Sequence, residues 1–125
     1  MDITSSSDGT KLAAVAWGGY LYTSTDSGAT WTSAGTGVQA PVGTPKNWRS
    51  TTSSSDGVVL AAVVDGGKIW TSADSGVNWV EDLTIGTMKE WQGITSSDDG
   101  AKLAAAARAN KIFTSSDSGV KWVPQ

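Results

Sequence analysis

The strongest constraint on the fold of this chain is a sequence unit that occurs three times in succession. Each copy opens with a Thr-Ser-Ser-x-Asp-Gly segment, at Thr4–Gly9, Thr52–Gly57 and Thr95–Gly100. Each copy closes with a Ser-x-Asp-Ser-Gly-x-x-Trp segment, at Ser24–Trp31, Ser72–Trp79 and Ser115–Trp122. The Asp of the opening segment and the Asp of the closing segment are 18 positions apart in every copy. This constant spacing predicts one structural unit that is repeated three times.

The secondary structure of the unit follows from comparing its copies. Leu103–Asn110 alone would favour a helix, because Ala and Arg are strong helix formers. Its counterparts, Leu60–Val64 and Leu12–Ala16, carry β-branched Val, and all three runs are too short for a stable helix. Asp-Gly and Gly-Gly pairs between the runs predict tight hairpin turns. Four antiparallel strands are therefore expected per unit; in the first copy they are Ile3–Ser6, Lys11–Ala16, Tyr20–Ser24 and a strand beginning near Thr30.

Four-stranded units of forty-odd residues predict an all-β fold of β-propeller blades. The expected blades cover residues 1–47, 48–90 and 91–125 of a single domain. Small Ala residues in the second strands suit inner strands crowded between blades, and burial on both faces explains why apolar and polar residues do not alternate. A solenoid would need shorter turns of the chain and is disfavoured.

Composition narrows the range of functions. The chain has 125 residues, no Cys and no His, which excludes disulfides, Cys/His zinc sites, Ser-His-Asp triads and cysteine nucleophiles. A net charge of −3 argues against nucleic acid or anionic membranes as partners. No apolar run is long enough to span a bilayer, and no basic-then-apolar leader is seen. Seven Trp residues argue for a packed structure despite the high content of Ser, Thr and Gly.

The closing segments resemble the Asp-box, or BNR repeat, of sialidase-like β-propellers. The resemblance covers nearly the whole chain and implies that each segment is a structural hairpin between the third and fourth strands, away from any catalytic face. It also suggests an extracellular or cell-surface parent protein. The residues to which it assigns a role in folding are Ser24, Asp26, Gly28, Trp31, Ser72, Asp74, Gly76, Trp79, Ser115, Asp117, Gly119 and Trp122. Because the loops lack alternating oxygen ligands and a terminal Glu, no Ca²⁺ site and no other metal site is expected.

Catalysis and cofactors are not expected. Sialidases of the resembled family need an arginine triad, a Tyr nucleophile with a Glu partner and an Asp acid/base, whereas this chain has only Arg49 and Arg108. Tyr20 and Tyr22 lie in the expected third strand with no Glu nearby. The ordinary glycosidase pair of carboxylates is also missing, because the acidic residues around Glu81 indicate a solvated loop.

Ligand binding is expected at the end of the units opposite the Asp-box hairpins, where the copies differ. The candidate residues are Trp17, Trp48, Arg49, Asp65, Trp91 and Arg108. A flat aromatic ring beside charged and amide groups suits stacking on a sugar ring, as in propeller lectins that bind glycans between blades. Trp48 and Trp91, however, recur four residues before Thr52 and Thr95, so the alternative is that they seal the contacts between blades. For Trp17 both roles stay open.

Three blades do not close a ring, since propellers use about four to eight. The first copy starts at Met1 and the last stops shortly after Trp122, so assembly is expected: two chains give six blades, the favoured number, and three chains give nine. The sequence thus predicts a self-assembling, non-catalytic propeller with carbohydrate binding. The alternative is a purely structural propeller, which is either a minimal or designed repeat or a scaffold for protein contacts. The chain is also consistent with a three-blade fragment of a longer repeat protein.

Overall fold

The computed structural model describes residues 1–34, 44–109 and 111–125, and all regular elements in these ranges are β-strands. No helix in the described ranges could cross a membrane. The strands are β1 Asp2–Ser5, β2 Leu12–Val15, β3 Trp17–Gly19, β4 Leu21–Ser24, β5 Thr32–Ser33, β6 Lys46–Ser53, β7 Leu60–Gly67, β8 Ile69–Ser72, β9 Val80–Glu81, β10 Lys89–Ser96, β11 Leu103–Ala107, β12 Lys111–Ser115 and β13 Val123–Pro124. The expected all-β fold is confirmed.

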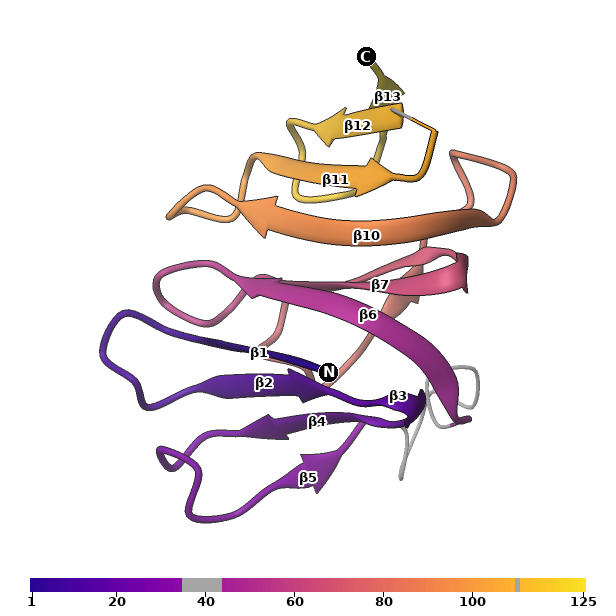
Figure 1. The fold of residues 1–125 in the computed structure, drawn as a ribbon. Helices are drawn as coiled ribbons and strands as arrows, with labels where there is room; N and C mark the ends of the chain where they lie inside the picture. The colour runs from indigo at the N-terminus through magenta and orange to yellow at the C-terminus, as the bar shows by residue number, and fades with distance from the viewer. Residues whose placement is uncertain (35–43, 110) are drawn as a thin grey trace.

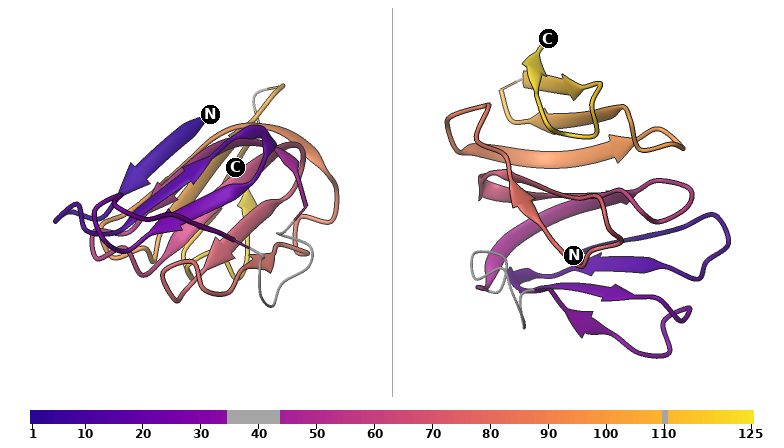
Figure 2. Two further views of the ribbon diagram at one scale, coloured as in Figure 1. Left: turned by 90° about the horizontal axis from the view of Figure 1, so that it is seen from below. Right: turned by 180° about the vertical axis from the view of Figure 1, so that it is seen from behind.

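The strands form three antiparallel, four-stranded units in chain order. Unit 1 contains β1, β2, β4 and β5, unit 2 contains β6 to β9, and unit 3 contains β10 to β13. The register repeats between the second and third strands, where Ala14 faces Tyr22, Ala62 faces Trp70 and Ala105 faces Phe113. The units lie one above another, with unit 1 at the bottom of Figure 1 and unit 3 at the top. The same order is visible from behind (Figure 2).

One strand was not expected from the sequence. The sequence predicts a tight turn at Gly18-Gly19, but Trp17–Gly19 forms β3, which pairs with β6, where Trp17 lies opposite Asn47. The corresponding end of β7 pairs with β10, where Asp65 lies opposite Glu90. The backbone groups of a turn need hydrogen-bond partners, and here the first strand of the next unit supplies them. This pairing links neighbouring units through their backbones.

The core lies between the units. We call the side of a unit that faces the following unit its forward face, and the side that faces the preceding unit its rear face. Ala13, Val15 and Leu21 on the forward face of unit 1 pack against the rear face of unit 2. Ala61, Val63 and Ile69 on the forward face of unit 2 pack against the rear face of unit 3. Because successive residues of the Leu60–Val64 part of β7 are buried on opposite faces, this part of its sequence is a continuous apolar run.

Candidate functional site

Each unit has two ends, and both kinds of Asp-containing turn lie at the same one. We call it the turn end; it carries the turns around Asp8 and Asp26 and their counterparts, which contact each other through Ser27 N and Thr10 O at 2.9 Å. The opposite end, which we call the connection end, carries the turns between second and third strands and the segment 82–88 that joins units 2 and 3. The two ends differ in what their polar groups do.

The polar groups of the turn end serve the backbone. In the turn of unit 1, Ser24 Oγ donates to Asp26 Oδ1 at 2.8 Å and accepts from Gly28 N at 2.9 Å. Thr30 N donates to Asp26 Oδ1 at 2.8 Å. Equivalent bonds hold the turns of units 2 and 3. Ser27 and Gly28 have φ values of 59° and 87°, so the turn uses two consecutive left-handed residues, of which the sequence indicated only the glycine.

These hydrogen bonds stabilise the ionised carboxylates. The pKa of Asp26 is lowered to about 2, first by the Thr30 hydroxyl, then by the Thr30 N–H and the Ser24 hydroxyl. The pKa of Asp8 is lowered to about 2, first by the Thr10 N–H and then by the Ser6 and Thr10 hydroxyls. A carboxylate that accepts several such bonds is a weaker base than usual. The turn carboxylates thus support the fold electrostatically, whereas a general acid needs a raised pKa.

The predicted ligand residues lie at the connection end, where Arg108 and Asp65 both lie next to Glu90. The rings of Trp48 and Trp91 are fully buried between units, edge-on to Trp70 and Phe113, and therefore offer no free face to a ligand. Arg49 Nη2 donates to Gln92 Oε1 at 3.1 Å, and Arg108 forms a 3.4 Å ion pair with Glu90. Trp17 is 52% exposed. Asp65 is partly buried and lies opposite Glu90 in the sheet.

The outer faces of the first and last units, which no other unit covers, expose residues whose equivalents in other units are buried. On the forward face, Ile69 of unit 2 is 0% exposed, but its counterpart Ile112 of unit 3 is 50% exposed. On the rear face, Trp79 of unit 2 is 2% exposed, but its counterpart Trp31 of unit 1 is 40% exposed. Because three blades do not close a ring, the sequence predicts uncovered units at both ends of the chain but does not name their exposed residues. The equivalent positions of the three copies are the sequence signal that locates these residues.

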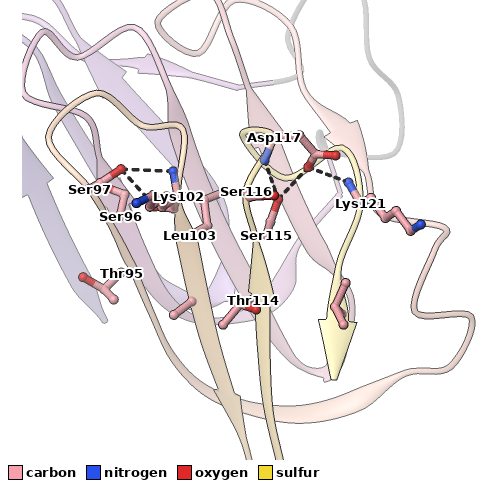
Figure 3. A pocket seen from close by; sticks show the side chains of 12 residues that line it. Thr95, Ser96, Ser97, Lys102, Leu103, Thr114, Ser115, Ser116, Asp117 and Lys121 are labelled. Atoms are coloured by element: carbon pink, nitrogen blue, oxygen red, sulfur yellow. Dashed lines mark hydrogen bonds between the residues drawn. The ribbon is translucent and has the colours of Figure 1, made fainter. Parts of the chain in front are cut away.

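The forward face of unit 3 is hollowed into a groove of about 510 Å³. Figure 3 shows it from close by, with the hydroxyl side chains of Thr95, Thr114 and Ser115 and the side chains of Lys102 and Lys121 around it. Its lining residues are Thr95, Ser96, Ser97, Lys102, Leu103, Ala104, Thr114, Ser115, Ser116, Asp117, Lys121 and Val123. No group of three or more carboxylates in the described part of the chain is placed to hold a metal ion. The groove offers apolar, hydroxyl and charged contacts, the last from Lys102, Asp117 and Lys121.

Comparison with solved structures identifies the fold. The structure named "YCF48 bound to D1 peptide" superposes with a TM-score of 0.76 at 17% identity, covering 99% of this chain and 40% of that one. YCF48 from Cyanidioschyzon merolae gives 0.73 at 18% identity, covering 99% of this chain and 36% of that one. A GH74 enzyme from Niastella koreensis gives 0.71 at 21% identity, covering 99% of this chain and 17% of that one. These are β-propeller proteins, so the expected propeller fold is confirmed.

The chain spans less than half of each of these similar proteins. No model of a protein family matches the sequence, and no curated protein matches it.

Proposed function

We propose that this chain is a self-assembling, non-catalytic Asp-box β-propeller in which copies of the chain complete one ring. Each four-stranded unit is a blade, and two chains with six blades are the favoured ring. Three chains with nine blades are the alternative. The ring provides a rigid scaffold whose connection end is free to bind other molecules.

The observation that carries the proposal is the difference in burial between equivalent residues. Ala61, Val63 and Ile69 are fully buried on the forward face of unit 2. In unit 3 the same positions hold Ala104, Ala106 and Ile112, none of which is buried. Burial of apolar surface contributes about 25 cal/mol per Å², so covering this face favours association. Large uncovered apolar faces on a soluble protein usually mark contacts with another protein.

The charged side chains support a non-catalytic role. A glycoside hydrolase needs one carboxylic acid whose pKa is raised and a second carboxylate across the scissile bond. Six Asp residues in the described turns have a shifted pKa, and in each of them the pKa is lowered. The pKa of Asp56, for example, is lowered first by the Ser54 hydroxyl and then by the Val58 N–H. Arg49 and Arg108 are occupied by Gln92 and Glu90.

The oligomeric mass tests the proposal. We expect native mass spectrometry of the 125-residue chain to give twice 12.8 kDa, with the monomer appearing only on dilution. Three times that mass would support the nine-blade ring. A folded chain that remains at 12.8 kDa at micromolar concentration would overturn self-assembly.

Carbohydrate binding at the connection end is a second candidate function, because Trp17 presents a half-exposed indole there. An exposed indole can stack on a sugar ring while neighbouring polar groups bind its hydroxyls. One similar structure is named a xyloglucanase, from Xanthomonas campestris. A glycan array tests this function: we expect bound glycans to be lost in the Trp17→Ala variant, and an array without binding would overturn it.

A further inference from the structure

We propose that the groove on the forward face of unit 3 receives the Ser27–Gly28 turn of a second copy of this chain, so that the copies join head to tail. This inference rests on the proposed self-assembly and specifies its surfaces. The two contacts between units inside the chain show which partners the uncovered residues of the end faces lack.

A threonine lies against a turn glycine at both internal contacts. A Cβ atom added to Gly76 would come within 2.6 Å of Thr23 Cγ2, and one added to Gly119 would come within 2.6 Å of Thr71 Cγ2. Only a glycine therefore allows this close approach between neighbouring units. The third pair in the series is Thr114, which lines the groove, and Gly28. A Cβ on Gly28 would have its nearest contacts with Leu12 and Trp31 of its own unit.

A lysine side chain also contacts the turns of the following unit. Lys11 Nζ donates to Ser75 Oγ at 3.1 Å, and the side chain of Lys11 covers Gly57. The residue of unit 3 that corresponds to Lys11 is Lys102, which is exposed and lines the groove. The residues of unit 1 that are equivalent to Ser75 and Gly57, the contacts of Lys11, are Ser27 and Gly9. Apart from its two chain neighbours, no described residue lies within 4 Å of a Cβ placed on Gly9. Unit 2 has Val59 at this position, so among the three units the Lys pattern is shared by units 1 and 3 only.

A pair of hydroxyl groups across the contact between units 2 and 3 has an equivalent pair on the two end faces, where the two residues are not in contact. Thr52 Oγ1 and Ser96 Oγ are 3.1 Å apart across the contact between units 2 and 3. Thr95 of the groove and Ser5 of unit 1 are the same residue types at the corresponding positions.

The backbone continues the series. Ser7 N donates to Ser55 O at 2.7 Å, and Ser55 N donates to Asp98 O at 2.7 Å. Within the described ranges the Asp98 N–H has no backbone acceptor and the Ser7 C=O has no backbone donor. These two groups are the donor and the acceptor that one more contact of the same geometry would join.

The uncovered groups are complementary between the two end faces and not within either one. The forward face of unit 3 offers Thr114, the Lys102 ammonium and the Asp98 N–H, whereas the rear face of unit 1 offers Gly28, the Ser27 hydroxyl and the Ser7 C=O. Unlike surfaces make a heterologous interface, which produces a ring when its rotation closes. The occupant of the groove is therefore the rear face of a second copy.

A charge exchange tests this pairing. Ser27→Lys places an ammonium group beside Lys102 of the neighbouring copy, and we expect it to weaken assembly about tenfold or more. Adding Lys102→Glu to the same chain converts the clash into an ion pair, and we expect the dissociation constant to return to within about threefold of the original. Lys111→Glu is the matched control, because this exposed Lys of unit 3 lies at the connection end. Circular dichroism verifies that each variant is folded.

The outcomes separate the two proposals. Rescue by the double variant supports head-to-tail pairing, because Ser27 and Lys102 belong to opposite end units of one chain. If the wild-type chain assembles but the double variant is weaker than Ser27→Lys, the head-to-tail inference is wrong while self-assembly stands. Filaments that respond to the charge exchange would support the head-to-tail contact and overturn ring closure. A wild-type chain that never assembles would overturn both.

Discussion

At the scale of single residues, the turn at Asp26 shows what its recurring sequence provides. The carboxylate accepts hydrogen bonds from Ser24 and Thr30, while the adjacent Ser27 and Gly28 turn the chain with positive φ values. An Asp side chain in a turn stabilises backbone N–H groups in this way. The resemblance of the closing segments implied a role in folding for Asp26 and Gly28, and these hydrogen bonds and φ values are local to the turn. The sequence did not predict the left-handed Ser27, because a serine pays a steric cost there that only the surrounding bonds offset.

The lowered pKa values predict a loss of stability in acid. Asp8 and Asp26 each have a pKa lowered to about 2 in the folded chain, below the ordinary value of 3.8. A carboxylate of this kind stabilises the fold above its unfolded pKa and ceases to do so as the pH falls through its folded pKa. We therefore expect the melting temperature to be constant above about pH 5 and to decrease between about pH 4 and pH 2.

The variant Asp26→Asn provides the control for this prediction. It keeps an acceptor oxygen but cannot titrate, so the variant should be less stable at pH 7 and should lose less stability on acidification. Thermal melts followed by circular dichroism at half-unit pH steps measure both effects. Parallel melting curves for the two proteins across this pH range would show that Asp26 is not responsible.

At the scale of strands, comparison of the three copies decided what local propensity could not. Leu103–Ala107 forms β11 although its residues favour a helix. The sequence predicts this strand because the equivalent segments contain Val and because the segment between the turns is short. What the sequence missed was β3, whose pairing with β6 depends on how two units sit beside each other. Contacts between units also bury Trp48 and Trp91 completely, and this burial depends on the neighbouring unit, so the sequence of one unit cannot show it.

The turn tryptophans predict unequal effects in equivalent positions. Trp79 is buried and its Nε1 donates to Gly76 O at 3.0 Å, so Trp79→Ala should cost about 3–5 kcal/mol of folding free energy. Trp31 is partly exposed at the rear face of unit 1, so Trp31→Ala should cost less than half as much in the isolated chain. Urea denaturation at a concentration below assembly measures both. Equal losses would contradict the open rear face.

At the scale of the whole molecule, the sequence specifies the contacts between units more closely than the number of units in a ring. The pairs Thr23 with Gly76 and Thr71 with Gly119 limit how closely neighbouring units approach. The number of units in the proposed ring depends on the angle between units, which results from the packing of every side chain in the two clusters between them. No single motif encodes that angle, so the choice between two and three chains needs an experiment on the assembly.

A covalent tandem of two copies makes that choice. In a six-blade ring, each contact between chains becomes a contact within the tandem, and tethering raises the effective concentration of the two end faces to roughly the millimolar range. The tandem should therefore be a monomer of twice 12.8 kDa, and its melting temperature should not depend on protein concentration. The unlinked chain, by contrast, should melt at a higher temperature as its concentration rises, because dissociation accompanies unfolding. Mass measurement and melting curves over a hundredfold range of concentration give both results. A tandem that associates further would contradict the six-blade ring. Its end faces would then be open, so that more than two copies of the chain would be needed to cover them.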